Sequence, residues 1–247
     1  MFILKKSALL FFLVTCICFS QGKVSEVTYK VKGVINIDEN TKENVKNLLS
    51  DVFKEMETLE FVLLFNKTES IFYEKINMSS DQNKGSLLPT IGQTMSFTGK
   101  LYTNKNTGLM LRQKPLSSNL FIIESSISDI KWSLTNETKK ISNYTCFKAT
   151  AIDTIETVKG SKSIAVIAWY APSLPFAYGP ANYLTLPGLI LELQNDKILF
   201  YADKIELDKI SNDNLVIPPS KGKLVSKKEY NEIEKNGFEK YKQYIKN

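Results

Sequence analysis

The chain of 247 residues contains no histidine. Without an imidazole it cannot form a Ser-His-Asp triad or a Cys-His pair, and it cannot hold zinc or copper through histidine. It also lacks the side chain that transfers protons most readily near neutral pH. An enzyme built on this sequence would have to use carboxylates, lysine, tyrosine or serine.

Cysteine is nearly as scarce, with residues only at Cys16, Cys18 and Cys146. The first two lie in a leader that we expect to be removed, so the mature chain cannot close an internal disulfide or build a four-cysteine metal site. Glycine-rich phosphate-binding and dinucleotide-binding motifs and the G-x-S-x-G motif are also absent. We therefore predict no catalytic residue, no cofactor and no metal site.

Only one long hydrophobic run is present, and it lies at the beginning of the chain. Two lysines precede an apolar stretch at residues 8–19, and Ser20 offers the small side chain that signal peptidases read. We predict that residues 1–20 are a signal peptide, that the mature chain begins at Gln21, and that it is exported to the periplasm or secreted. No later segment is long enough to cross a bilayer of about 30 Å.

Lipid anchoring through Cys16 or Cys18 is an alternative fate for the leader. A lipidated cysteine normally follows a small residue, whereas Thr15 and Ile17 precede these two. Cleavage after Ser20 is therefore the preferred interpretation. The lysines of the mature chain are scattered among acidic residues, so we expect no nucleic-acid partner.

Most of the mature chain alternates apolar and polar residues, as β-strands with one buried face do. This pattern predicts a single β-rich domain over residues 21–247, of which 218–247 form a C-terminal helical tail. The expected fold class is α+β and predominantly β. We expect a curved antiparallel meander sheet, either open or rolled into an open barrel, with one amphipathic helix after the first strand and another helix at the C-terminus.

The amphipathic helix is predicted over residues 45–56, with Asn40 as its N-cap. Residues 77–94 are polar and punctuated by glycine and proline, which predicts a long loop. A hairpin turn is expected at residues 135–138. Strands are predicted at residues 24–37, 59–65, 70–75, 97–103, 109–113, 120–124, 130–134, 141–151, 163–171, 189–193 and 198–207.

Three further features follow from residue type. Trp132 and Cys146 are each interpreted as core side chains. Prolines at four positions between 172 and 187 predict an ordered irregular connection, because proline removes a ladder donor and fixes φ. Ser226 with Glu229 predicts a capping box for the last helix.

An ordered series of motifs runs from residue 130 to residue 193. It comprises IKWSL at 130–134, YTCFKAT at 144–150, AWY at 168–170, GP at 179–180 and LPGLIL at 186–191. This series resembles the GLPGLI family of exported proteins of Gram-negative bacteria, although Thr185 replaces the first glycine of the hexapeptide. The resemblance implies a β-rich fold and export, and it transfers no catalytic residue.

The residues around the hexapeptide admit two interpretations. In the first, Pro187 and Gly188 direct the chain into a buried strand. In the second, the region forms the rim of a groove for a ligand or partner. The candidate binding rim consists of Trp169, Tyr170, Pro180, Leu186, Pro187 and Gly188.

Two functions from different classes fit these observations. The preferred hypothesis is a non-catalytic binding or accessory protein of the cell envelope that holds an apolar small molecule or an envelope protein. The alternative is a histidine-independent hydrolase or lyase that uses carboxylates, for which Glu124, Glu192 and Asp203 are the nominal candidates.

Overall fold

The computed structural model describes residues 23–34, 42–76, 87–127, 130–157, 160–209 and 216–246. The predicted signal peptide lies outside the described residues. The strands are β1 Val24–Gly33, β2 Glu60–Phe65, β3 Glu69–Glu74, β4 Lys100–Asn104, β5 Leu109–Leu116, β6 Asn119–Ser126, β7 Ser133–Ile141, β8 Tyr144–Thr157, β9 Gly160–Ala171, β10 Leu189–Asn195, β11 Ile198–Lys209 and β12 Lys223–Ser226. The helices are α1 Glu43–Met56, α2 Leu88–Ser96 and α3 Lys227–Lys246.

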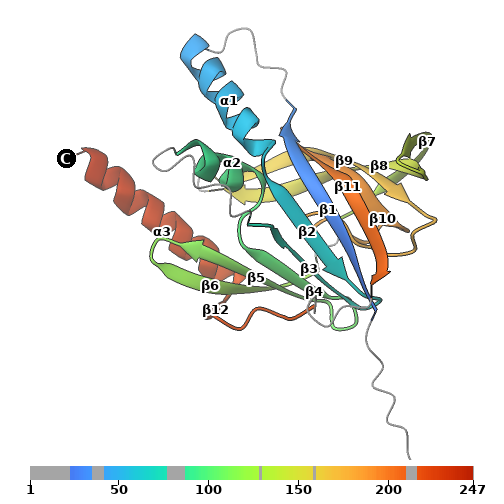
Figure 1. Ribbon diagram of the computed structural model, residues 1–247. Helices are drawn as coiled ribbons and strands as arrows, with labels where there is room; N and C mark the ends of the chain where they lie inside the picture. Colours follow the sequence, from blue (N-terminus) through green and yellow to red (C-terminus); the bar gives the residue numbers. More distant parts are fainter. Residues whose placement is uncertain are drawn as a thin grey trace, which may run out of the picture.

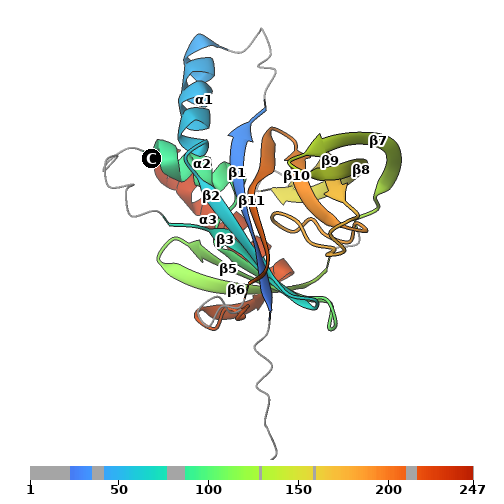
Figure 2. The ribbon, with the colours of Figure 1, turned by 45° about the vertical axis from the view of Figure 1, so that its right-hand side comes forward.

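All twelve strands belong to one sheet, in the order β12-β6-β5-β4-β3-β2-β1-β11-β10-β9-β8-β7. The sheet is strongly curved (Figures 1 and 2). Every pair is antiparallel except β12 with β6. Because β12 and β7 are the two ends of this order and do not pair with each other, the sheet is open. The predicted predominantly β fold with an antiparallel meander is therefore confirmed.

Strand β1 joins two meanders. The first runs from β1 to β6, and the second runs from β7 to β11 and returns to β1. Val27 on β1 is opposite Leu63 on one side and Ile205 on the other. A strand with two partners has no free edge, which fits the complete burial of Val27, Tyr29 and Val31.

The main core fills one face of the sheet with aromatic side chains. Tyr29, Phe61, Phe65, Phe72 and Phe200 are at most 1% exposed, and the rings of Phe61 and Phe72 stack with centroids 5.6 Å apart. A fully buried phenylalanine contributes about 1.5–3 kcal/mol. This cluster connects strands of both meanders, so the two halves share one core.

Helix α1 confirms the predicted amphipathic helix. Its N-cap is Lys42, which makes no side-chain capping bond, so the prediction of Asn40 as the cap was wrong. Only Val52 and Met56, in its second half, are buried, whereas Val45 and Leu48 are exposed. The first turns stand away from the sheet in both views (Figures 1 and 2).

Two local predictions were wrong. Residues 88–94 of the predicted loop belong to helix α2, in whose first turn the proline is tolerated because its missing N–H needs no partner there. Residues 77–86 of that loop lie outside the described part. The turn predicted at residues 135–138 is a register shift between β7 and β8, and the hairpin turns instead at Ser142 and Asn143. Ser142 has φ of 51°, which a two-residue hairpin turn can require.

Residues 172–187 form the ordered irregular connection that the prolines predicted. The backbone N–H of Leu189 donates to the carbonyl of Leu174, and that of Ile190 donates to Tyr178. A Cβ at Gly188 would lie 2.3 Å from the carbonyl oxygen of Ala171, so only glycine fits this close approach. This confirms the interpretation that Gly188 helps to direct the chain into a buried strand.

Helix α3 begins with the predicted capping box. The Ser226 backbone N–H donates to Glu229 Oε2 at 2.7 Å, and the Glu229 N–H donates to Ser226 Oγ at 3.2 Å. Tyr230 is buried against Phe121 of β6. The later part of α3 leaves the body, because Tyr241 is 61% exposed.

Candidate functional site

The six residues of the candidate binding rim are distributed between the interior and the surface. Tyr170, Pro180, Leu186 and Gly188 are buried, and Pro187 is exposed. Trp169 is half-buried, and its neighbour Tyr170 points to the opposite face of β9. The buried four help to seat residues 172–187 on the core, so most of this set packs inside the molecule.

Trp169 lies beside a charged pair. The ammonium of Lys139 is 2.6 Å from Glu192 Oε1 and 4.4 Å from the centroid of the Trp169 ring. The face of the Trp169 ring attracts the ammonium group of Lys139, and the Glu192 carboxylate neutralises the charge of that ammonium group. This arrangement ties β7, β9 and β10 together.

Trp132 and Cys146 pack as predicted. The indole N–H of Trp132 donates to the carbonyl oxygen of Leu184 at 3.1 Å, and the ring meets that of Tyr183. Cys146 is fully buried, and burial raises the pKa of its thiol to about 11. A thiol in this state is a poor nucleophile at physiological pH.

The three nominal catalytic acids do not form one site. Glu192 on β10 pairs with Lys139, and Asp203 on β11 pairs with Lys30 at 3.3 Å. Glu124 lies on β6, with six strands between it and β10 in the sheet order. It lines a separate groove of about 540 Å³ that also includes Glu229, whose carboxylate is held by Ser226.

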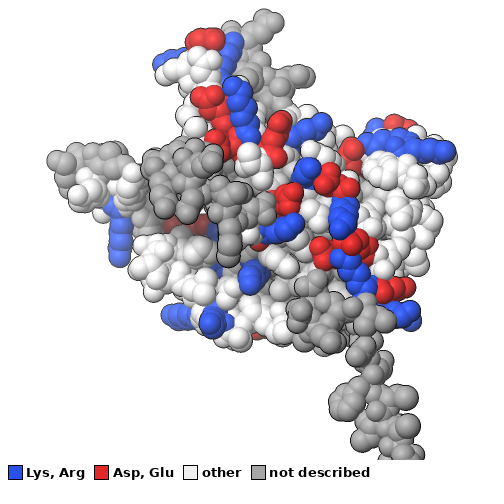
Figure 3. All heavy atoms as spheres, in the orientation of Figure 1, with Lys and Arg blue, Asp and Glu red and all other residues white. Residues whose placement is uncertain are grey.

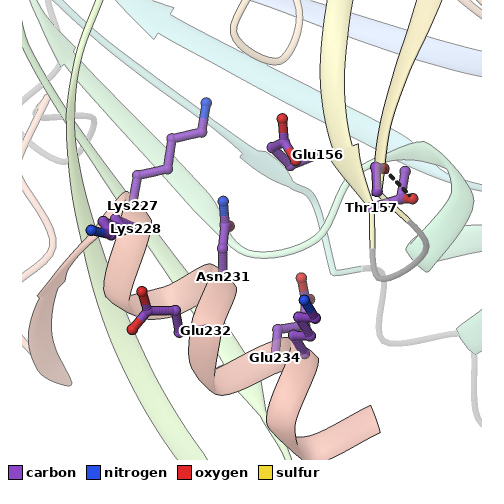
Figure 4. A pocket seen from close by; sticks show the side chains of 9 residues that line it. Glu156, Thr157, Lys227, Lys228, Asn231, Glu232 and Glu234 are labelled. Atoms are coloured by element: carbon purple, nitrogen blue, oxygen red, sulfur yellow. Dashed lines mark hydrogen bonds between the residues drawn. The ribbon is translucent and has the colours of Figure 1, made fainter. Parts of the chain in front are cut away.

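A larger groove of about 730 Å³ lies between the β8–β9 hairpin and α3 (Figure 4). Its hairpin wall is formed by Glu156, Thr157 and Gly160. Lys227 and Asn231 extend from α3 toward the side on which Glu156 lies (Figure 4). The remaining lining residues, all on α3, are Lys228, Glu232, Glu234 and Lys235.

Some charged side chains of this groove have a partner, and others have none. Glu234 Oε1 is 3.0 Å from the ammonium of Lys114, and Glu156 accepts a hydrogen bond of 2.6 Å from the Ser161 hydroxyl. Lys227, Lys228 and Lys235 form no ion pair with any residue in the described part of the chain. Within the described residues the groove therefore offers three lysines without an ion pair beside two carboxylates without one, those of Glu156 and Glu232.

A buried cation lies behind α3. The guanidinium of Arg112, the only arginine of the chain, stacks over Phe97 at 4.5 Å and donates from Nη2 to the carbonyl of Thr98. Burial lowers the pKa of Arg112, whereas it raises that of Tyr230 to about 12. Arg112 Nε and the Tyr230 hydroxyl find no hydrogen-bond partner within the described residues.

Sequence reasoning identified neither the groove nor Arg112. The groove combines the β8–β9 hairpin with a helix about seventy residues later, and no local pattern links the two. For Arg112 a signal did exist, because a single arginine among 32 basic residues points to a position that lysine cannot fill.

Charges of both signs are mixed on the face seen in Figure 3, where lysine and acidic side chains alternate over the sheet. On that face neither sign covers a continuous area. None of the described helices combines the length and the apolar character needed to cross a membrane.

Comparison with known proteins connects the second meander to one family. The model of a family described as "Protein of unknown function (Porph_ging)" matches residues 132–164 and 156–192, a stretch that runs from the entry to β7 into β10. No curated protein sequence matches the chain.

Solved structures similar to this chain share its fold. Two structures of PNGF-II, in the C2 and P21 space groups, align with TM-scores of 0.52 and 0.53 at 14% identity. The alignments cover 85% and 86% of this chain but 32% and 33% of those chains. The chain thus spans about a third of the length of the solved structures that it matches.

Proposed function

We propose that this protein is a non-catalytic binding or accessory protein of the cell envelope, and that it binds a protein partner in the groove between α3 and the β8–β9 hairpin. The observation that supports this proposal most is the filling of the apolar face of the sheet. Tyr178, Tyr183 and Leu186 pack with the sheet aromatics, so the protein's own side chains take the volume that an apolar ligand would need. Of the two grooves described above, this one is the larger, and its lysines form no ion pair within the described residues.

Catalysis is disfavoured by the placement of the acids. A carboxylate-based hydrolase typically uses two carboxylates that share one cleft. Glu192 and Asp203 each face a lysine, and Glu124 shares its groove with Glu229, whose carboxylate is held by Ser226. Ion-paired carboxylates serve better to fix neighbouring strands than to transfer protons.

The proposal includes export and removal of residues 1–20, as the leader and the resemblance to exported GLPGLI proteins suggest. Mass spectrometry of the protein isolated from the envelope fraction tests this part. We expect an N-terminus at Gln21. A retained leader, or a lipid on Cys18, would overturn it.

Site-specific photo-crosslinking in the native host tests the groove. A photoreactive phenylalanine analogue replaces Asn231, which faces the groove, or Asn143, which is exposed at the β7–β8 turn. We expect one discrete higher-mass adduct from position 231 and none from position 143. The proposed binding surface is wrong if both positions give no adduct or the same mixture.

A further inference from the structure

We infer that α3 is a lid over the sheet, and that its Glu234 carboxylate takes the place of an external oxyanion, a carboxylate or phosphate group, at Arg112 and Lys114 of β5. The inference concerns the surface beneath α3 and goes beyond the protein partner proposed for the groove. Three observations carry it: two buried polar atoms without a partner, an internal carboxylate that faces two cations, and a helix with few attachments.

The interface between α3 and the sheet contains two buried polar atoms that lack a partner. Arg112 Nε on β5 and the Tyr230 hydroxyl on α3 form no hydrogen bond with any residue in the described part of the chain. A buried donor without an acceptor costs about 1–3 kcal/mol. Movement of α3 away from β5 would let both atoms reach water, so opening would relieve this cost.

Strand β5 presents two cations to α3. Arg112 and Lys114 are two residues apart on the strand, so their side chains point to the same face of the sheet. Lys114 Nζ lies 5.2 Å from the centroid of the Tyr230 ring, and Arg112 forms no ion pair within the described residues. A guanidinium with a free Nε–H matches the oxygens of a carboxylate or phosphate group.

The helix brings one carboxylate to these two cations. Glu234 Oε1 is 3.0 Å from Lys114 Nζ. Burial lowers the pKa of Arg112, and the nearby Tyr230 and Glu234 act in the opposite direction. Because a single carboxylate faces both cations, an oxyanion from solvent would compete with Glu234 for the same position, and the closed lid would inhibit its binding.

Helix α3 has few attachments that would oppose such a movement. It follows β12 without a loop, and its capping box lies within this junction and can turn with the helix. The first half is held on β6 through Tyr230, whose ring meets that of Phe121. From residue 235 to residue 244 every side chain is exposed except Phe238, which is half-buried. The second half therefore does little to hold the lid closed.

The groove beside α3 gives the helix room to move. It has a volume of about 730 Å³ and separates α3 from Glu156 and Thr157 of the β8–β9 hairpin (Figure 4). Tyr230 and Glu234 are four residues apart and lie on the same side of the helix. They would therefore leave β5 together as α3 turns about its junction with β12, and this movement would uncover both cations.

Pulsed electron paramagnetic resonance tests the lid in the full mature chain. Nitroxide labels are attached through Gln243→Cys on α3 and Asn119→Cys on β6, two exposed positions, and Cys146→Ala removes the native thiol. We expect a second, longer distance between the labels in addition to that of the closed form. Inorganic phosphate should increase the fraction of the longer distance, whereas potassium chloride at equal ionic strength should not.

Substitutions in the labelled protein separate the lid from the oxyanion site. Glu234→Gln removes the internal carboxylate and should raise the fraction of the longer distance roughly two- to fivefold without phosphate. Arg112→Gln should abolish the response to phosphate. Arg112→Lys, which keeps the charge but lacks Nε, should lose most of the response and replaces Arg112→Gln if that variant does not fold. Lys67→Gln removes a charge from the exposed β2–β3 turn and should respond as the parent does.

Two kinds of outcome would overturn the inference. A single distance under every condition, in Glu234→Gln as well, would show that α3 is a fixed part of the body rather than a lid. A response to potassium chloride equal to that to phosphate, a response that persists in both Arg112 variants, or its loss in Lys67→Gln would refute the oxyanion site. None of these results depends on the crosslink from position 231, which tests the partner of the groove.

Discussion

At the scale of single residues, Thr185 is the position where amino-acid type and backbone disagree. Its φ is 76°, in the left-handed region that favours glycine and strongly disfavours β-branched residues. Its side chain is exposed, so packing does not compensate. Glycine would adopt this backbone conformation without a steric cost.

We predict that Thr185→Gly stabilises the protein by about 0.5–1 kcal/mol, because relief of about 1–2 kcal/mol of strain exceeds the entropy cost of glycine. Urea unfolding measures the change. As a matched control, Gly188→Ala should destabilise by more than about 2 kcal/mol, since its Cβ would meet the Ala171 carbonyl oxygen. A lower midpoint for Thr185→Gly would contradict the prediction.

Cys146 gives a prediction about pH. Burial raises its pKa from the ordinary 9.0 to about 11, so between these values the unfolded thiol loses its proton before the folded one does. The folded state then binds more protons, and the free energy of unfolding falls as pH rises through this window. Cys146→Ala should reduce the fall.

Thiol labelling checks the same residue directly. At pH 9 we expect a disulfide reagent to react with Cys146 far more slowly in the native protein than in urea, because the native thiol is both neutral and inaccessible. Equal rates would mean that the thiol is exposed or ionised in the folded state.

At the scale of elements, the first turn of α3 is better stabilised than its second half. Its capping box satisfies two backbone donors, whereas Gly237 interrupts the unpacked half. We predict that Gly237→Ala increases helix stability by about 1 kcal/mol, since the added methyl group meets no neighbour. Hydrogen exchange of the amides of residues 236–244 should slow.

The matched change at the other end of α3 has the opposite sign. Ser226→Ala removes the cap and should cost about 1 kcal/mol of unfolding free energy. If Gly237→Ala left exchange unchanged, the second half of α3 would already be held by contacts other than its own backbone.

Helices and strands could be predicted from the sequence where the apolar residues of a long segment recur with a single period. The stripe ending in Val52 and Met56 identified α1, and alternation identified most strands. Helix α2 was missed because Pro89 and Gly92 are typical of loops. In fact the proline is in the first turn, and Gly92 lies within the helix, where an added Cβ would be in ordinary contact with Met56 at 3.7 Å.

At the scale of the whole molecule, neither the pairing of the strands nor the position of the candidate groove could be predicted from local sequence patterns. Strand β1 pairs with β11 from the far end of the chain, and the Tyr29 hydroxyl donates to the carbonyl of Ile190 at 2.6 Å. The candidate groove likewise needs the tertiary fold to bring Glu156 near Lys227. A strand's period says which face is buried, but not which strand lies beside it.

The shared core predicts that both meanders unfold together. Phe72 on β3 contacts Phe200 on β11, with ring centroids 6.1 Å apart, and the two tryptophans, Trp132 and Trp169, belong to the second meander side. Phe72→Ala should destabilise by about 3–5 kcal/mol. Although the change lies in the first meander, we expect tryptophan fluorescence and far-UV circular dichroism to shift to the same lower urea midpoint.

Truncation of an exposed residue provides the comparison. Leu120 on β6 is 38% exposed, so Leu120→Ala should move both midpoints only slightly. If Phe72→Ala shifted the circular dichroism transition and left tryptophan fluorescence in place, the second meander would fold without the first. In that case β1 would connect two cores that unfold independently, and the aromatic contacts across β1 would contribute little to cooperativity.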